Sequence, residues 1–183
     1  MDRPPGVRDV RPMRCPSCGA PGVELGGRIN LHGHGVRARY LAGPPILGAE
    51  PTTIDIVLRR YKCQRCEAVL TVGPRGVVPG YVYSAMTIGL ALLLWGVLQQ
   101  PEAKVQRALG VHRICGASRP ERWQALRRWA RAATKGQLWQ SIQVSLRGQA
   151  RELAERVARI LCARAGPAAT DVERIWSASA HAR

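Results

Sequence analysis

Two pairs of cysteines occur in this sequence at a spacing that metal coordination uses. They are Cys15/Cys18 and Cys63/Cys66, each of the form Cys-x-x-Cys. Such a turn directs two thiolates toward one point, and two turns together complete a tetrahedral set of four sulfurs. An all-thiolate set suits Zn²⁺ and leaves no open coordination position for catalysis. We therefore predict one structural zinc ion held by Cys15, Cys18, Cys63 and Cys66.

Other metal and redox interpretations use the same segment. A thioredoxin-like redox pair needs one Cys-x-x-Cys at the start of a helix in a βαβ unit, and neither pair has that setting. Iron in place of zinc, as in a rubredoxin-like site, is an alternative, although nothing else in the sequence suggests electron transfer. His32 and His34 lie between the pairs and are competing ligands, but we expect them on the first strand or turn of a ribbon.

The scaffold that brings the two pairs together is predicted by the pattern between them. Apolar residues alternate with polar ones over 36–40 and 54–59, and a third short strand follows at 69–72. The Pro/Gly-rich stretch 41–52 predicts a loop between the first two strands. We therefore expect a small antiparallel zinc ribbon over residues 15–72, which depends on the metal because so small a module is marginal without it.

The rest of the chain has a different hydrophobic period. After residues 73–80, an extended linker, the period changes from two to about 3.6 residues. Helices are expected near 84–98, 102–109, 119–133 and 138–165. The predicted fold class is small α+β, organised as a flexible basic arm (1–14), the zinc ribbon (15–72), the linker (73–80), a helix-turn-helix-like module (81–135), a long amphipathic helix (136–165) and a tail (166–183).

The charge balance indicates a polyanionic partner. The chain has 28 Lys+Arg against 12 Asp+Glu, a formal net charge of +16. A GC-rich genome would explain Arg in place of Lys but not the excess over acids. Such an excess repels itself unless a polyanion accepts it, and nucleic acid is the usual acceptor; a membrane surface or an acidic partner is the alternative. On the ribbon we expect phosphate contacts from Arg37, Arg39, Arg59 and Arg60.

The segment 119–133 carries the strongest candidate for contact with a DNA groove. An S-x-x-E capping box at Ser118 to Glu121, with Pro in the first turn, predicts a helix start. Projected at about 100° per residue, Trp123, Leu126 and Trp129 fall on one side and a Gln with several cations on the other. The solvent-exposed face of an ordinary helix would also contain acidic residues. The predicted DNA-binding residues of this helix are Gln124, Arg127, Arg128, Arg131 and Lys135.

Two further helical segments have open interpretations. The stripe from Leu146 to Ile160 steps by 4-3-4-3, so it packs either on the helical core or on a second copy, as a homodimer through residues 146–160. The apolar segment 81–98 would reach only about 22 Å as a helix over 84–98, short of a hydrocarbon core of about 30 Å. We expect a buried core helix there, with a membrane-anchored zinc ribbon as the alternative.

The order of these features resembles the N-terminal part of bacterial insertion-sequence transposases. The features are Cys-Pro-x-Cys-Gly, a basic strand, Arg-Arg-Tyr-Lys-Cys-x-x-Cys, a short Val/Thr strand and a hydrophobic helix opening a helix-turn-helix, over roughly residues 13–135. The chain looks most like short uncharacterised proteins encoded beside mobile elements. In those transposases this region recognises the terminal DNA of the element, and a following RNase H-like domain cuts it. The resemblance implies DNA binding, with a transposase or integrase as a partner, and does not support catalysis.

Catalytic residues are not evident in the sequence. A two-metal nuclease needs carboxylates that converge from adjacent strands, and no such set is visible. Cys115 near His112 lacks an orienting acid or an oxyanion donor. The aspartates are scattered along the chain: Asp2, Asp9, Asp55 and Asp171.

We therefore expect a zinc-containing protein that binds double-stranded DNA, accessory or regulatory to a transposon or other mobile element, and not an enzyme. Without a leader-like apolar stretch in residues 1–20, and with thiols in metal-binding pairs, we expect it in the bacterial cytoplasm at the nucleoid. The alternatives are a protein-interaction adaptor that docks a transposase or polymerase subunit, and an RNA-binding protein.

Overall fold

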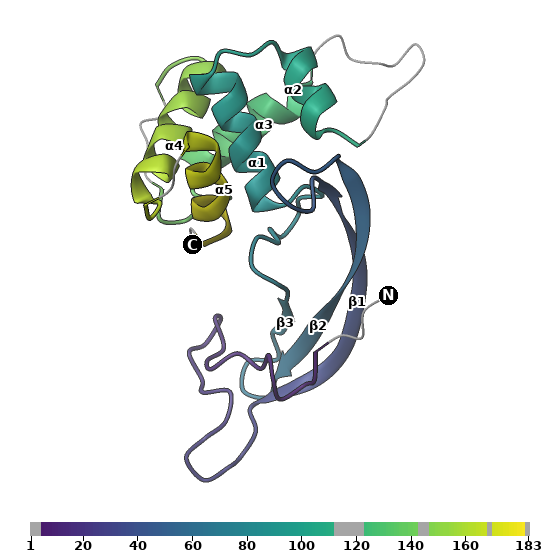
Figure 1. Cartoon of the computed structure of the whole chain (residues 1–183). Coiled ribbons are helices and arrows are strands. Elements are labelled where there is room, and N and C mark those ends of the chain that lie inside the picture. The colour runs from purple at the N-terminus through teal and green to yellow at the C-terminus, as the bar shows by residue number, and fades with distance from the viewer. Residues whose placement is uncertain (1–4, 112–122, 143–146, 168–169, 182–183) are drawn as a thin grey trace. The chain divides into compact units, whose positions relative to one another are not determined.

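The computed structural model describes residues 5–111, 123–142, 147–167 and 170–181 (Figure 1). It confirms a small α+β fold with an antiparallel three-stranded sheet in the N-terminal part, followed by helices. The chain divides into two compact units. The ribbon unit consists of Met1–Tyr40 and Asp55–Pro74, and the helical unit consists of Leu41–Ile54 and Arg75–Arg183.

The sheet has the strand order β1-β2-β3. Its strands are β1 (Leu31–Gly43), β2 (Thr52–Cys63) and β3 (Val69–Val72). All three predicted strands are therefore present, although β1 begins earlier than the alternating pattern indicates. β2 and β3 pair antiparallel, with Arg59 opposite Val72 and Lys62 opposite Val69. This register places Tyr61 on one face of the sheet and Arg60 on the other, because successive side chains point to opposite faces.

Residues 5–14 cover one face of this sheet. Predicted as part of a flexible arm, they instead lie against β2, where the Tyr61 hydroxyl donates to the Val7 carbonyl (2.6 Å). The Arg59 guanidinium donates twice to the Pro5 carbonyl, at 3.1 and 2.7 Å. Val7 and Val10 pack on the small core that contains the fully buried Tyr61. The apolar residues of this segment hold it against the sheet. Its arginines and prolines, on which the prediction of a flexible arm rested, do not indicate this packing.

The helical unit has an apolar helix at its centre (Figure 1). Its helices are α1 (Ala85–Leu92), the π-helical turn η1 (Leu93–Val97), α2 (Glu102–Leu109), α3 (Gln124–Thr134), α4 (Ala150–Arg164) and α5 (Asp171–His181). α1 packs against α3, α4 and α5, and η1 packs against α4. The predicted buried core helix is therefore confirmed. No helix among the described residues is long and apolar enough to span a membrane.

A side-chain cap fixes the start of α1, and a glycine allows η1 to approach α4 closely. The Ser84 hydroxyl accepts from the Thr87 N–H (3.1 Å), which caps the helix start. A Cβ placed on Gly96 would lie 2.4 Å from the Glu155 backbone nitrogen, so only glycine permits this approach of η1 to α4. The tip of the β1–β2 hairpin also belongs to this unit, because the Ala42 N–H donates to the Val82 carbonyl (3.0 Å).

The later helices differ from the prediction in their bounds. The helix expected near 138–165 is shorter, since α4 begins at Ala150 behind Gly148, whose φ of 116° is outside the helical region. Trp139 and Ile142 are nevertheless buried in the helical core. The expected tail, 166–183, contains α5, which begins with a capping box of Thr170 and Glu173.

The 4-3-4-3 stripe packs inside the chain. Leu153 and Val157 of α4 are 4% and 0% exposed, and Ala150 and Ile160 also pack on the helical core. Leu146 lies outside the described residues. Of the two interpretations of this stripe, packing on the helical core is confirmed, and its buried residues are not available to a second copy.

A helix-turn-helix arrangement remains a prediction. α2 has the predicted bounds, Glu102–Leu109. α3 begins at Gln124, and the expected start of this helix at 119–122 lies outside the described residues, as does most of the connector between the two helices.

Candidate metal centre

The two Cys-x-x-Cys turns have the same backbone conformation. The Cys15 carbonyl accepts from the Gly19 N–H (2.8 Å), and the Cys63 carbonyl accepts from the Glu67 N–H (2.9 Å). Each of these first cysteines also donates its own N–H to the carbonyl five residues later, at 2.8 and 2.9 Å. Gly19 and Glu67 both take a left-handed conformation, with φ of 73° and 60°. The centre is thus built from two copies of one turn.

A buried asparagine connects the loops that carry the two turns. Asn30, only 5% exposed, donates through its amide to the Pro21 carbonyl and to the Glu24 carboxylate, both at 3.0 Å. Its own carbonyl accepts from the Gln64 N–H (2.8 Å) inside the second turn. These bonds hold the first turn's loop beside the end of β2, where Cys63 lies.

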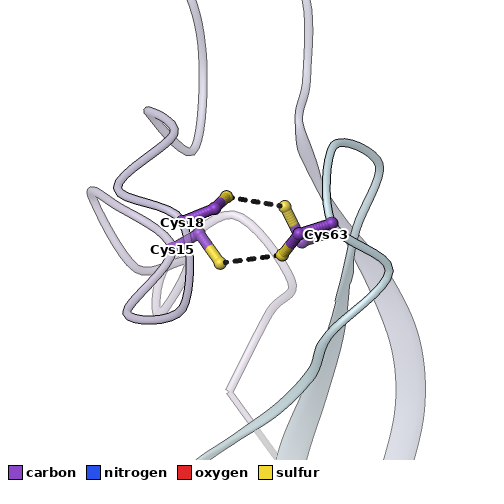
Figure 2. A group of neighbouring side chains, drawn as sticks. Cys15, Cys18 and Cys63 are labelled. Atoms are coloured by element: carbon purple, nitrogen blue, oxygen red, sulfur yellow. Dashed lines mark hydrogen bonds between the residues drawn. The ribbon is translucent and has the colours of Figure 1, made fainter.

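The four sulfurs form a compact group (Figure 2). Cys15 Sγ lies 3.7 Å from Cys66 Sγ, Cys18 Sγ lies 3.8 Å from Cys63 Sγ, and all four lie within 4.8 Å of one another. A tetrahedral zinc site with Zn–S bonds of about 2.3 Å has sulfur–sulfur edges of about 3.8 Å. The distances are far longer than a disulfide bond of about 2.05 Å. The four cysteines therefore fit a structural metal ion.

The competing histidine ligands are placed elsewhere. His32 and His34 are exposed on β1, as expected for residues of the first strand. The His32 Nε2 lies 2.9 Å from the Ile29 carbonyl. Neither belongs to the group of ligand atoms that the described residues bring together.

The thiols of Cys15 and Cys66 in this centre have very different pKa values. Burial disfavours the Cys15 thiolate, but hydrogen bonds from the backbone of Cys18 and Ser17 outweigh this and lower the pKa of Cys15 to about 6. For Cys66 a backbone hydrogen bond from Ala68 favours the thiolate, but the neighbouring sulfurs and burial raise its pKa to about 12. The first thiolate forms easily and the last one with difficulty, because the negative charges crowd together. A bound divalent cation would remove that conflict.

The ribbon arginines predicted to contact phosphate do not share one environment. Arg37 is exposed on β1, whereas Arg39 and Arg60 are half-buried. Arg59 is occupied by its bonds to the Pro5 carbonyl. Arg60 lies on the face of the sheet opposite Tyr61, where it pairs in register with Thr71. Arg37 is therefore the ribbon cation with the clearest access to a partner.

Four of the residues predicted on α3 form one exposed stripe. Gln124, Arg128, Arg131 and Lys135 are all exposed. Their spacing of four, three and four residues places them on one side of the helix. We call these four residues the α3 stripe.

The fifth predicted residue of this helix, Arg127, turns away from the stripe. It forms an ion pair of 2.6 Å with Glu102 of α2, and the two side chains are 24% and 19% exposed. Hydrogen bonding to that carboxylate raises the pKa of Arg127. Its guanidinium also lies 5.6 Å from the ring centroid of the buried Trp95. Arg127 thus connects α2 to α3. The pattern of α3 alone does not predict this role, because the partner Glu102 lies far away in the sequence.

The opposite side of α3 faces the core, as predicted. Leu126 is fully buried and Trp129 is 4% exposed. Trp123, Trp129 and Tyr83 form a cluster of edge-to-face rings, with centroids 5.1 to 6.0 Å apart. Such pairs add to the stability gained from burial, so the aromatic side fixes which residues of α3 face outward.

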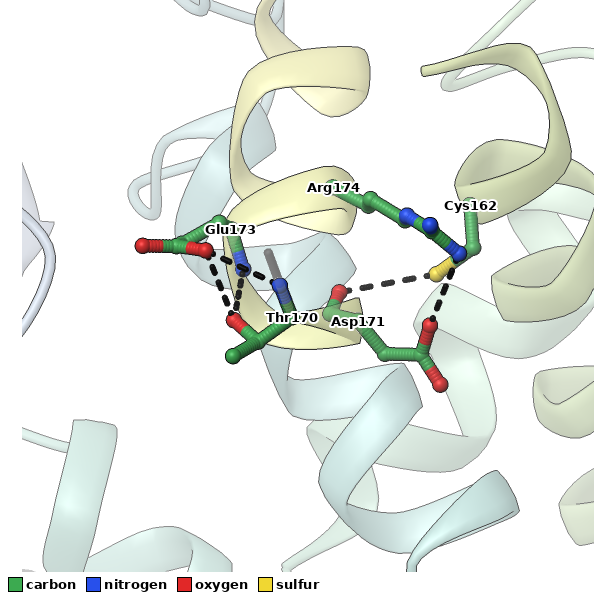
Figure 3. Close-up of polar contacts among 5 residues, drawn as sticks. All are labelled: Cys162, Thr170, Asp171, Glu173 and Arg174. Atoms are coloured by element: carbon green, nitrogen blue, oxygen red, sulfur yellow. Dashed lines mark hydrogen bonds and ion pairs between the residues drawn. The ribbon is translucent and has the colours of Figure 1, made fainter. Parts of the chain in front are cut away.

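The other described cysteine lies in a structural setting (Figure 3). The Cys162 thiol donates to the Asp171 carbonyl (3.6 Å), and Arg174 pairs with the Asp171 carboxylate (3.6 Å). Thr170 and Glu173 bond each other in the α5 capping box. Burial raises the pKa of Cys162, so this thiol is a poor nucleophile. Cys115 and His112 lie outside the described residues.

Comparison with protein-family models, with curated proteins and with solved structures gives no match to the chain.

Proposed function

We propose that this chain is a structural zinc protein that binds double-stranded DNA. The observation that carries the DNA-binding part is the α3 stripe, which presents Gln124, Arg128, Arg131 and Lys135 to solvent on one side of a helix. The metal part rests on the cysteine geometry, and the choice of zinc rests on the closed set of four thiolate ligands.

The distribution of acids supports a polyanion as the partner of the stripe. α3 contains no Asp or Glu. In the helical unit Glu102, Glu152, Glu155 and Asp171 each pair with an arginine outside the stripe. The stripe spans about 16 Å along the helix axis, at 1.5 Å per residue. Three cations over that length repel one another in the free protein, and phosphates of a duplex would relieve that repulsion.

A specific observation also favours a second candidate, a protein-interaction adaptor. Met13 and Leu25 of the ribbon unit are 90% and 111% exposed, and Val23 is 45% exposed. The Gly22 N–H donates to the Met13 carbonyl (2.7 Å), which brings the chain at Met13 beside that at Val23. Exposed apolar side chains that lie together are typical of a docking surface. In either case, an accessory role beside a transposase rests on the sequence resemblance.

Salt dependence separates the two candidates. We would measure binding of the zinc-loaded full chain to a fluorescent mixed-sequence duplex over a series of salt concentrations. For DNA binding the logarithm of the affinity falls with that of salt by about 0.9 for each phosphate neutralised. An apolar adaptor surface would show little such dependence.

Variants of the stripe complete this test. The double variant Arg128→Ala/Arg131→Ala should reduce the salt slope by about 2, because two phosphate contacts are lost. Arg159→Ala is the control, since Arg159 is an exposed cation of the same unit that pairs with Glu155. No affinity for duplex at low salt, or an unchanged slope in the double variant, would refute the proposal. Competition with an RNA hairpin tests the RNA-binding alternative.

A further inference from the structure

A cavity in the helical unit opens between η1, α4 and α5. Its volume is about 260 Å³, which equals that of about eight or nine molecules of liquid water at about 30 Å³ each. An organic molecule of about nine or ten non-hydrogen atoms therefore fits it. The cavity shares no residue with the α3 stripe or with the four cysteines, so it is a separate feature of the chain.

The apolar part of the cavity lining comes from η1 and α4. It consists of Leu93, Val97 and Ala163. Leu93 is 1% exposed, and Val97 is a partly buried neighbour of the helical core. η1 is a π-helical turn in which the Leu98 N–H donates to the Leu93 carbonyl (3.0 Å), and such turns are frequent at functional sites. An aliphatic group that lies on these side chains gains free energy by leaving water.

Charged side chains of α4 and α5 also line the cavity. They are Arg159, Asp171 and Arg174, so guanidiniums outnumber carboxylates among the described lining residues. Arg174 pairs with Asp171 through Nη1 at 3.6 Å, and Arg159 donates to Glu155 through Nε and Nη2. Because a guanidinium has several N–H groups in a planar fork, each arginine keeps donors for a further oxygen atom.

The Cys162 thiol lies beside these charges. Figure 3 shows the Arg174 side chain extending across Asp171 toward the Cys162 sulfur. Burial and the Asp171 carboxylate raise the pKa of this thiol, and Arg174 and Arg159 offset only part of the rise. Cys162 therefore stays neutral near neutral pH, and it does not compete with another anion for the guanidiniums.

We propose that this cavity binds a small carboxylic acid with an apolar body of about six to eight carbons. Its carboxylate accepts from Arg174 and Arg159 at the mouth, where these side chains are 44% and 64% exposed, and its apolar body lies on Leu93 and Val97. Hydrogen bonds between a guanidinium and a carboxylate are among the strong ones. Apolar walls with a few polar groups are typical of small-molecule sites. The site goes beyond the proposed DNA-binding function and does not depend on it.

Octanoate is a probe of suitable size and charge. Isothermal titration calorimetry of the zinc-loaded full chain should show binding with a dissociation constant of about 1 mM or below. Octan-1-ol and acetate should bind at least about tenfold more weakly, because the alcohol has no charge and acetate has no apolar body. Inorganic phosphate should not displace octanoate, since it cannot use the apolar walls.

The Cys162 thiol provides a second readout. In a zinc-loaded Cys115→Ser chain, Cys162 is the remaining thiol outside the candidate metal centre. Octanoate at about ten times its dissociation constant should slow the reaction of Cys162 with N-ethylmaleimide about tenfold, because only about one chain in eleven is then unoccupied. Cys162→Ser in the same background removes the reacting group and is the control.

Three variants locate the bound molecule. Arg174→Gln should weaken octanoate binding by about tenfold or more, because one guanidinium is lost. Ala163→Leu fills the cavity from an exposed position of α4, so it should also prevent binding without removing a charge. Arg164→Ala is the matched control, since Arg164 is an exposed cation of α4 that does not line the cavity. Thermal melting of each variant checks that the fold is kept.

Three outcomes would overturn the proposal. One is no binding at octanoate concentrations up to about 10 mM, both by calorimetry and by protection of Cys162. Another is equal affinity for octan-1-ol and octanoate, because the guanidiniums would then contribute nothing. The third is binding that persists in both Arg174→Gln and Ala163→Leu, which would put the ligand elsewhere on the chain. None of these results affects the test of DNA binding, which varies duplex and salt.

Discussion

The two cysteine turns have the same backbone conformation. Comparison of the two predicts that glycine at position 67 would make the second turn more stable than Glu67 does. Glu67 has a φ of 60°, in the conformation that Gly19 has at the same place in the other turn. A left-handed conformation costs an L-residue about 1–2 kcal/mol relative to the right-handed one, and glycine avoids that cost. Glu67→Gly should therefore stabilise the second turn, and the gain can be worked out from what the Glu67 side chain contacts.

The carboxylate of Glu67 makes one exposed ion pair. It lies 3.4 Å from Lys62, and the Lys62 and Glu67 side chains are 39% and 80% exposed, so the pair contributes about 0–1 kcal/mol. Both Glu67→Gly and Glu67→Ala remove it, so their difference isolates the backbone. We expect the glycine variant to be more stable than the alanine variant by about 1 kcal/mol.

The first turn supplies the reciprocal variant. Gly19 has a φ of 73°, and a Cβ added there would meet nothing within 4 Å. Gly19→Ala therefore adds conformational strain without a clash and should cost about 1 kcal/mol. A gain of stability in Glu67→Gly and a loss of stability in Gly19→Ala, at equivalent positions, would be difficult to explain by any cause other than the shared backbone conformation.

The assay is competition for zinc between the full chain and a coloured chelator, supported by urea unfolding of the zinc-loaded chain. A difference of about 1 kcal/mol is about a fivefold change in zinc affinity, since about 1.4 kcal/mol is tenfold. If Glu67→Gly binds zinc no more tightly than Glu67→Ala, the centre does not need the left-handed backbone, and the argument from two equal turns fails.

Three further predictions follow from the structure. The pKa of Cys15 in the metal-free chain, lowered to about 6, means that its thiolate favours the folded form at high pH and that this contribution is lost as pH falls through about 6; the zinc affinity should therefore fall more steeply with pH below about 6, by one further proton, because Cys15 must then also lose its proton to bind the metal, and a slope that stays the same across that pH would contradict it. Arg127→Ala should destabilise the helical unit by about 1–3 kcal/mol in thermal melts because Glu102 loses its partner, whereas the exposed neighbour variant Arg128→Ala should stay within about 0.5 kcal/mol. Gly96→Ala should cost about 1–3 kcal/mol because η1 must move away from α4, and Gly166→Ala, with nothing within 4 Å, is its control; equal melting of the two would show that the helices can separate without cost.

Local patterns in the sequence predicted the parts of the fold that depend on neighbours along the chain. The spacing of Cys15/Cys18 and Cys63/Cys66 was sufficient to predict a four-cysteine site, because each turn fixes its own two sulfurs. The alternation over the strands and the bounds of α2 were equally local. The aromatic side of α3 followed from the helical period alone.

Features that depend on distant partners were not predictable in the same way. Arg127 projects with the other cations of α3, and only the folded chain shows Glu102 beside it. Residues 5–14 were predicted as part of a flexible basic arm, and only the folded chain shows that the Tyr61 hydroxyl donates to the Val7 carbonyl. α5 lies in a stretch whose sequence pattern predicts a helix only weakly. Burial of Ile175 in the helical core stabilises this helix.

The division of the β1–β2 hairpin between the two units has a consequence for how the protein is synthesised. All residues of the ribbon unit, the four cysteines included, have been synthesised once Pro74 has left the ribosome, so the candidate metal centre can assemble while the rest is still being made. The hairpin tip, which includes Leu41 and Ala42, must wait for α1 and the later helices before it is covered. During translation that tip is an uncovered apolar surface on an otherwise finished module. A chain cut after residue 80 would keep this surface permanently, so the two units are not separable by a single cut.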